Sequence, residues 1–406
     1  MTDVLGVGWG LMFVALAVLG VLRQQPVLFM ASLTMLAISC TVRAWGRVAL
    51  KGVSLKKRIN PSRVFPGESA SLTISLENRK LLPAPWVWLE EDVPDGIELR
   101  GGRLGLHHRQ GRKRLLSFFS LGCYQRVNRE YRIRIDRRGY YSFGPTKLTC
   151  GDPFGLYKES LVFEDQVNLL VYPGILPVES LRLVPAHPLG TAGASDPLFE
   201  DPTSIAGIRD YDPGDDFRRI HWKASARMGK LQAKVYEPRT DTQVAIFVDG
   251  ASHDPPWLRA DMDVIDRTVV VGASILNHCL ERRFVTGVFS NGFVMGSGME
   301  LAIPPGRSPD LFEQAMEGLA RLWIPTRSIA DVLDLETPRL PAGCGVVIVT
   351  AFLNERLRGS ILRVRGAGRW VEVFLVTSDD RVEAVPGAAV YRVRWDGGEG
   401  LEMERE

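Results

Sequence analysis

The first 42 residues of the chain contain two long stretches without a charged side chain. Residues 4–22 and residues 26–42 carry no Lys, Arg, Asp or Glu and are mostly apolar. A helix of about 20 apolar residues can cross a lipid bilayer, and about 17 residues is the lower limit. We therefore expect a transmembrane helical hairpin whose tight turn is residues 23–26. The alternative, a cleaved signal peptide followed by an apolar strand, is weaker, because no basic residue precedes the first stretch and no clear cleavage site follows it.

A basic cluster directly after the second stretch predicts how this hairpin is oriented. The cluster has no acidic residue up to position 60 and consists of Arg43, Arg47, Lys51, Lys56, Lys57 and Arg58. Positive charge next to the end of a membrane span marks the cytoplasmic side. We expect a multi-pass protein of the inner cell membrane, with both termini and all residues from about 43 onward in the cytoplasm. The same cluster can attract anionic lipid headgroups.

The length of 406 residues predicts two or three domains. We expect the hairpin and its basic flank at 1–58, a first domain at 59–180, a linker rich in Pro and Gly at 181–206, and a second domain at 207–400. The net charge of +3 excludes neither a nucleic-acid nor a membrane partner. The cysteines have neither the number nor the spacing of a disulfide framework or a zinc site: Cys40, Cys123, Cys150, Cys279 and Cys344.

Short alternating runs dominate residues 59–180. Residues 70–77 alternate apolar and polar side chains, residues 86–90 and 131–136 are also β-prone, and turn signals such as Asp95-Gly96 separate such runs. Many short strands with frequent turns predict a β-sandwich. No cluster in it has a catalytic pattern.

The first domain carries an uneven charge. Residues 100–140 contain 12 Lys or Arg and two acidic residues, whereas residues 61–99 contain seven acidic and three basic residues. A lipid-binding or nucleic-acid-binding surface is one interpretation of this basic excess. We favour the other, a solvated basic face that acidic side chains elsewhere partly offset.

Residues 207–239 form the densest segment of charged and aromatic side chains. The turn at 212–215 predicts an aspartate cap on a short helix over about 216–227, closed by Gly229 and followed by a strand over 231–236. Arginines can pair with neighbouring aspartates in two-point contacts that lysine does not reproduce. We expect Trp222 in the core, with an interface as the alternative, and expect surface pairing for Arg218 and Arg219.

The same segment contains one set of side chains that could carry chemistry. Asp215, Asp216 and His221 are residue types that bind metals or transfer protons. Asp216 and His221 are five positions apart, so on one helix they diverge by about 140°. We therefore prefer a structural or docking role for the segment and keep a hydrolase as the alternative. His221 could equally be a buried, hydrogen-bonded histidine beside Trp222.

Residues 241–396 alternate buried strands with helices. Apolar strands are predicted at 243–248, 284–289, 345–350 and 371–376, with helices at 259–282 and 308–322. Such a pattern is typical of a parallel, doubly wound α/β sheet, whose ligands lie beyond the carboxyl ends of its strands. The loops after Asp249 and Thr350 are therefore the places for a ligand. No Gly-rich phosphate loop follows the first strand, which disfavours a nucleotide site.

The segment 207–227 has a dense pattern of Arg, Asp, Gly, Pro and aromatic positions. These are Arg209, Tyr211, the run Pro213–Asp216, Arg218, Ile220 and the run Trp222–Arg227, which includes Lys223 and Ser225. This pattern resembles the core motif of the bacterial domain-of-unknown-function family 58. Residues 137–140 (Arg-Arg-Gly-Tyr) and 152–156 (Asp-Pro-Phe-Gly-Leu) are similar to further recurring pieces of that family.

The resemblance implies a von Willebrand factor type A-like domain at the C-terminus and association with a MoxR-type AAA+ ATPase. Type A domains often bind partners through a divalent metal held by an Asp-x-Ser-x-Ser loop after the first strand. Here Asp249 is present, but Ala251 and His253 stand at the two hydroxyl positions, and Ala351 and Phe352 follow Thr350 where another aspartate is expected. A hard cation needs more oxygen ligands than these, so we expect no metal or cofactor.

Together these patterns predict a membrane-anchored adaptor and not an enzyme. The bilayer would be contacted through residues 4–22 and 26–42, the protein partner would be a MoxR-type ATPase, and no nucleic acid is expected. The alternatives are the hydrolase with Asp215, Asp216 and His221, and a basic surface binder using residues 100–140.

Overall fold

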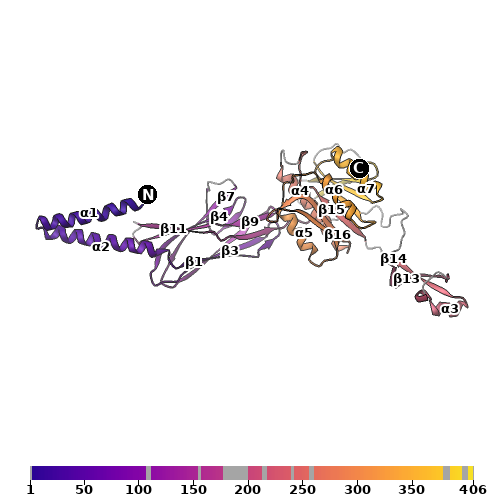
Figure 1. The fold of residues 1–406 in the computed structure, drawn as a ribbon, viewed down its shortest axis with the longest axis horizontal. Helices are drawn as coiled ribbons and strands as arrows, with labels where there is room; N and C mark the ends of the chain where they lie inside the picture. The colour runs from indigo at the N-terminus through magenta and orange to yellow at the C-terminus, as the bar shows by residue number, and fades with distance from the viewer. Residues whose placement is uncertain are drawn as a thin grey trace. The chain divides into compact units, whose positions relative to one another are not determined.

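The computed structural model describes residues 2–106, 111–153, 157–176, 200–212, 217–238, 242–255, 260–377, 385–395 and 401–405. The chain divides into two compact units (Figure 1). The first comprises residues 1–174 with 319–321, and the second comprises residues 175–318 with 322–406.

Two antiparallel helices open the first unit. α1 (Thr2–Leu22) and α2 (Pro26–Ala49) are joined by the predicted short turn, and proline occupies the first turn of α2, where its missing N–H costs nothing. Among the described helices, α2 is long and apolar enough to cross a membrane, and Gly10–Leu22 is a shorter apolar helix. α2 continues past the predicted end at residue 42 and includes Arg43 and Arg47.

The rest of the first unit is built from mostly antiparallel sheets around one hydrophobic core, in which only β2 and β12, among the described strands of this unit, pair in parallel. In β3 (Ser69–Asn78), every second side chain from Ala70 to Leu76 is buried in that core, which is the alternation predicted for residues 70–77. One sheet has the order β1-β3-β8-β5, a second β11-β10-β4-β7-β6 and a third β2-β12-β9. The other strands are β1 (Val53–Asn60), β2 (Arg63–Val64), β4 (Ala84–Pro94), β5 (Glu98–Arg100), β6 (Arg103–Leu106), β7 (Arg112–Leu121), β8 (Arg126–Arg134), β9 (Gly139–Phe143), β10 (Thr146–Gly151), β11 (Lys158–Phe163) and β12 (Val167–Val171).

A mostly parallel sheet forms the centre of the second unit. Its order is β17-β16-β15-β19-β20-β21-β22, and β18 pairs with β16. The five strands from β16 to β21 are parallel, whereas β17, β18 and β22 are antiparallel to their neighbours. The strands are β15 (Gln243–Val248), β16 (Val285–Val294), β17 (Glu300–Gly306), β18 (Leu322–Trp323), β19 (Gly345–Thr350), β20 (Val371–Val376), β21 (Ala389–Trp395) and β22 (Leu401–Arg405). The predicted strands and a mixed α/β class are confirmed.

Helices cover both faces of this sheet. Gly272 of α4 (Met262–Glu281) lies so close to Val248 that a β-carbon would clash with it, which places α4 on one face. Ala245 and Phe247 point to the opposite face and share a core with α6 (Ile329–Glu336) and α7 (Glu355–Gly366). α5 (Leu311–Ala320) occupies the region predicted as a helix over 308–322, whereas the sequence analysis did not identify α6 or α7.

The segment around residue 220 forms a small module of its own. β13 (Glu200–Asp210) pairs with β14 (Gln232–Pro238) in a two-stranded sheet, so the strand begins inside the region predicted as a linker. The single helix predicted over 216–227 is instead a 3-10 turn at Phe217–Arg219 followed by α3 (Trp222–Met228). Ile220 separates them because its backbone forms a bridge to Ala233 of β14.

Candidate functional site

Asp249 lies at the carboxyl end of β15, where the sequence predicts a ligand-binding loop. Its side chain is 1% exposed. Oδ1 accepts hydrogen bonds from the Ala251 N–H at 3.0 Å and from Asn291 Nδ2 at 2.8 Å, and Oδ2 accepts one from Thr350 Oγ1 at 2.8 Å. Burial raises the pKa of this carboxyl to about 6, against the opposing effect of these donors.

This arrangement does not fit a hard cation. Both carboxylate oxygens are aimed at donors of the protein, and Ser252 Oγ accepts from the Asp261 N–H at 2.9 Å and contacts His253 Nδ1 at 2.9 Å. Within the described ranges, no group of three His, Cys, Asp or Glu side chains is placed to hold a metal ion. The described residues at Asp249 therefore act as an internal hydrogen-bond network.

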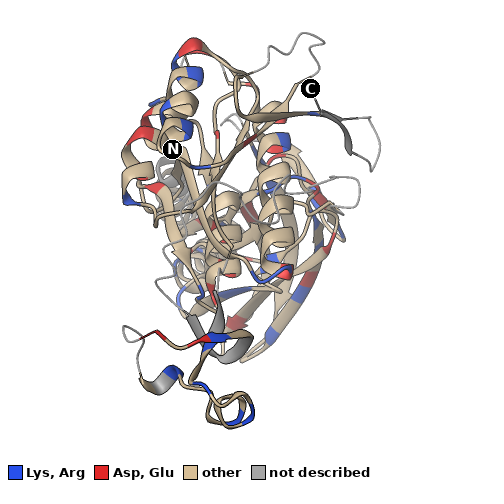
Figure 2. Ribbon diagram, turned by 90° about the vertical axis from the view of Figure 1, so that its right-hand side faces the viewer, with Lys and Arg blue, Asp and Glu red and all other residues tan. Residues whose placement is uncertain are grey.

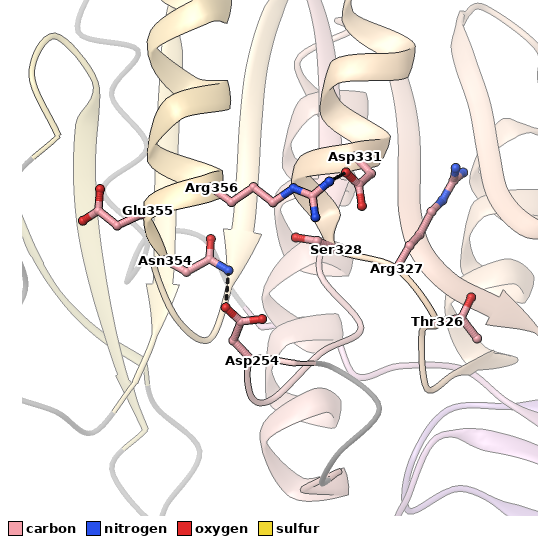
Figure 3. Close-up of a pocket in the computed structure, with 8 residues that line it drawn as sticks. All are labelled: Asp254, Thr326, Arg327, Ser328, Asp331, Asn354, Glu355 and Arg356. Carbon is pink, nitrogen blue, oxygen red and sulfur yellow. Dashed lines mark hydrogen bonds and ion pairs between the residues drawn. The ribbon is translucent and has the colours of Figure 1, made fainter.

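A cavity of about 670 Å³ lies beside this network (Figure 3). Its walls come from the loop after β15, from the loop after β19 and from the starts of α6 and α7 with the residues before α6. The lining residues are Asp254, Thr326, Arg327, Ser328, Asp331, Asn354, Glu355 and Arg356. Asn354 Nδ2 donates to Asp254 at 2.8 Å, and Arg356 pairs with Asp331. Among the charged lining residues, Arg356 and Asp331 thus pair within the walls, whereas Arg327 pairs with Glu300, which does not line the cavity.

The sequence analysis pointed to this edge of the sheet but missed Arg327, Asp331 and Arg356. The available signal was the pair of helix caps beside them. Ser328 Oγ accepts from the Ala330 N–H at the start of α6, and Asn354 Oδ1 accepts from the Leu357 N–H at the start of α7. Identifying those two helices would have placed all three charged residues near the carboxyl ends of the strands.

The second candidate site is the surface of α3 and its flanks, residues 217–231, which we call the α3 surface. α3 has no buried residue. Phe217, Trp222 and Met228 are 76%, 68% and 70% exposed, and Leu231 is also exposed. The expectation that Trp222 belongs to the core is therefore wrong. Its helix packs beside a two-stranded sheet, which offers no second layer that could enclose an indole ring.

Hydrogen bonds at both ends hold α3 in place. The His221 imidazole, and not an aspartate as predicted, caps its start by accepting from the Ala224 N–H at 3.1 Å. Ser225 Oγ donates to the His221 carbonyl at 3.1 Å and accepts from the Gln232 N–H of β14 at 2.8 Å. Gly229 ends the helix with a φ of 65°, as predicted from its position.

The capping role of His221 concerns the alternative prediction of a hydrolase that uses Asp215, Asp216 and His221. Because Nδ1 of His221 accepts a hydrogen bond, the neutral ring carries its proton on Nε2 and has no second free lone pair for a general base. Asp215 and Asp216 lie outside the described residues.

The charged residues of the motif are distributed unevenly along the module. Residues 217–236 contain six Lys or Arg and no acidic residue, and the α3 region in Figure 2 is accordingly marked in blue. Lys223, Arg227 and Lys230 are exposed and Arg219 is half-buried, whereas the side chain of Arg218 lies outside the described residues.

Upstream of α3 the module is held by polar contacts. Arg209 donates to the backbone carbonyl of Asp210, and the Asp210 carboxylate accepts from the Gln232 amide of β14. The Tyr211 ring lies 6.2 Å from the Phe217 ring, measured between centroids. The motif residues thus join hairpin and helix into one unit.

The basic stretch at 100–140 is partly paired. Lys113 pairs with Asp95 at 2.8 Å, Arg114 with Glu90 at 3.1 Å and Arg126 with Glu77 at 3.0 Å. All three carboxylates belong to the acidic stretch 61–99, in line with the interpretation that we favour for this face.

Comparisons with known proteins agree with the position of the motif. Residues 207–400 match the family described as "Protein of unknown function DUF58". The chain is 25% identical over 244 residues to the uncharacterized protein YeaD of Bacillus subtilis, a match that spans 60% of this chain and 57% of that protein.

Solved structures show only distant likeness. A CARDB domain from Pyrococcus furiosus is 14% identical with a TM-score of 0.18, covering 30% of this chain and 94% of its own. A cohesin module from Clostridium perfringens is 12% identical with a TM-score of 0.22, covering 29% and 96%. Residues 207–400 are thus similar to the DUF58 family, and YeaD is a distant homologue of the chain.

Proposed function

We propose that this chain is a membrane-anchored adaptor that belongs to the DUF58 family and docks a protein partner on its α3 surface. In this proposal α1 and α2 both cross the inner membrane, the sheets of the first unit act as a β-sandwich spacer, and the second unit is a type A-like domain. All parts after α2 are cytoplasmic. The partner is a MoxR-type AAA+ ATPase, as the resemblance of residues 207–227 implies.

The exposure of the α3 surface is the observation that supports this role. A seven-residue helix without a buried side chain carries an exposed Trp and an exposed Met. Two hydrogen bonds with Gln232 of β14 join the helix and its cap to the hairpin, one to Ser225 Oγ and one from the His221 N–H. Trp and Arg are enriched among the residues that dominate binding energy in protein interfaces. A pre-formed surface also loses less entropy on binding than a flexible one.

Docking in this proposal does not depend on a metal. Asp249, the position that corresponds to the metal loop of type A domains, is engaged by donors of the protein on both oxygens. The partner would therefore be recognised by side chains of the α3 surface, and chelators would leave binding unchanged.

The test is Trp222→Ala in the full-length chain. Because Trp222 is 68% exposed, the melting temperature should stay within about 2 °C of the parent, whereas affinity for a purified MoxR-type ATPase from the same genome should fall at least tenfold. Leu362→Ala is the matched control, since Leu362 is 47% exposed on α7, outside the α3 surface. An unchanged affinity of Trp222→Ala for the ATPase would contradict the docking role.

A further inference from the structure

The C-terminal end of α2 is built into the first unit. Ala49 and Leu50 are buried in its hydrophobic core, and Gly46 lies against the Tyr157 ring at a distance that leaves no room for a β-carbon. The last turn of α2 is therefore packed into the first unit. Segments that are hydrogen-bonded to this turn keep a constant position along the axis of α2.

Two turns between strands are fixed to that last turn. Residues 79–83 connect β3 to β4, and Lys80 Nζ donates to the carbonyls of Val48 at 2.8 Å, of Lys51 at 2.7 Å and of Ala49. A lysine at this place satisfies carbonyls that a helix C-terminus leaves without partners. The Arg79 N–H also donates to the Gly52 carbonyl at 2.9 Å.

The second turn, residues 122–125 between β7 and β8, is joined to the first. The Tyr124 N–H donates to the Lys80 carbonyl at 3.2 Å. Asn78 Nδ2 bridges both turns by donating to the Leu82 carbonyl at 3.0 Å and the Gly122 carbonyl at 2.8 Å. The two turns therefore form one rigid tip beside the end of α2.

This tip exposes apolar and basic side chains together. Leu81 is 73% exposed and Tyr124 is 68% exposed. Arg79 and Arg126 share one carboxylate, Glu77, at 3.3 Å and 3.0 Å, which leaves the tip with a net positive charge. Tyr is enriched at the membrane–water interface, and basic groups there attract anionic lipids.

The length of α2 sets the height of the tip. Its 24 residues span about 36 Å at about 1.5 Å per residue, which exceeds the hydrocarbon core of about 30 Å but not the full bilayer of about 40–45 Å. With Pro26 at the far edge of the hydrocarbon core, Ala49 lies in the headgroup layer on the near side. Lys80 holds the tip at that level.

We propose that the tip, residues 79–83 and 122–125, is a second membrane contact in which Leu81 and Tyr124 enter the headgroup layer. The inference rests on the proposed crossing of the bilayer by α2. In addition to the crossing by α2, the first unit would contact the membrane surface through two turns that are far from α2 in sequence.

Cys123 provides a native probe beside Tyr124. It is exposed, as is Cys40 on α2, whereas Cys150, Cys279 and Cys344 are buried. The full-length Cys40→Ser variant can therefore be labelled at Cys123 with an NBD maleimide and placed in nanodiscs of phosphatidylcholine and phosphatidylglycerol. A nitroxide on the lipid headgroups should quench the label at least twofold.

A label at Asp95 serves as the matched control. Asp95 follows β4, whose 11 residues lead away from the tip over about 35 Å. In Cys40→Ser/Cys123→Ser/Asp95→Cys, the same nitroxide should quench by less than a tenth. In the labelled Cys123 protein, adding Leu81→Ser with Tyr124→Ser should at least halve the quenching. Leu106→Ser is the control for these substitutions. Leu106 is 95% exposed, and it pairs with Lys113 of β7, which pairs in turn with Val93 near the end of β4 that is far from the tip. This substitution should leave the quenching of the Cys123 label unchanged.

The outcomes separate the two proposals. A chain that does not enter nanodiscs at all would overturn the membrane anchor. A chain that enters the discs but shows equal quenching at residues 123 and 95, or quenching insensitive to the Leu81 and Tyr124 substitutions, would overturn the contact by the tip and leave the anchor standing.

Discussion

At the residue scale, Asp249 shows how partners distant in sequence decide the role of a side chain. Its position at the end of a buried strand could be predicted, because an apolar run ends there. Its partners are Asn291 and Thr350, which are 42 and 101 residues away in the chain. The sheet order places β15 between β16 and β19, and this alone brings the three side chains together.

The buried carboxyl of Asp249 predicts a pH effect on stability. Since its pKa in the folded chain is about 6 and the ordinary value is 3.8, the folded state binds more protons than the unfolded state between these values. Stability contributed by this group is thus lost as pH rises from about 4 through 6, by up to about 3 kcal/mol.

We expect Asp249→Asn to remove this loss, because an amide can accept from Ala251 and Asn291 and donate to Thr350 without a charge. Thermal melting of the full-length parent and variant at pH 5 and pH 7.5 measures the difference. The gain of the variant over the parent should be larger at pH 7.5. Equal gains at both pH values would contradict the prediction.

At the element scale, α3 shows the limit of reading a helix from spacing. The apolar spacing over 216–227 is helical, yet Ile220 pairs with β14 and its side chain is buried, so the helix restarts after His221. A tertiary contact therefore overrides local preference. The final residues were predictable, because Gly229 is one of few residues that adopt a positive φ without strain.

A buried ion pair joins β1 to β4, two strands of different sheets. Lys57 Nζ lies 2.8 Å from Glu91 Oε1, their side chains are 2% and 0% exposed, and the Thr146 hydroxyl donates to the same carboxylate. Lys57 belongs to the basic cluster that predicted the orientation of the hairpin and that can attract anionic lipid headgroups. The structure places its charge inside the first unit instead, whereas Lys56 and Arg58 are exposed.

Removing one partner of this pair should destabilise the first unit. Lys57→Met leaves Glu91 buried without its cation, which should cost about 3–5 kcal/mol. Burial already raises the pKa of Glu91, so the loss should be smaller at pH 5 than at pH 7.5, where the unpaired carboxyl ionises.

Lys57→Met combined with Glu91→Gln is the control, because a neutral amide still accepts from Thr146 and leaves no buried charge. Thermal melting of both variants should show the double variant recovering at least half of the loss. A single variant that melts like the parent would mean that the pair does not stabilise the sheets.

At the scale of the whole molecule, the predicted topology concerns the two N-terminal helices. If α1 and α2 both cross the membrane, the basic residues in the last turns of α2 and directly after it hold the body of the chain in the cytoplasm. A C-terminal alkaline phosphatase fusion, active only outside the cytoplasm, should be inactive, and a C-terminal green fluorescent protein should fluoresce. The opposite pair of results would overturn the topology.

Elements with a local side-chain pattern could be predicted from the amino-acid order. Apolar runs predicted α2 and strands such as β15 and β19, and alternation of apolar and polar residues predicted β3. These predictions were possible because an element that is buried on one or both faces has apolar residues at regular positions in the sequence. The surroundings of individual side chains, in contrast, depend on contacts made in the folded chain. The tertiary structure exposed Trp222, buried Lys57 and attached Lys80 to the end of α2, since each outcome depends on a neighbour that lies far away in sequence and that no local pattern specifies.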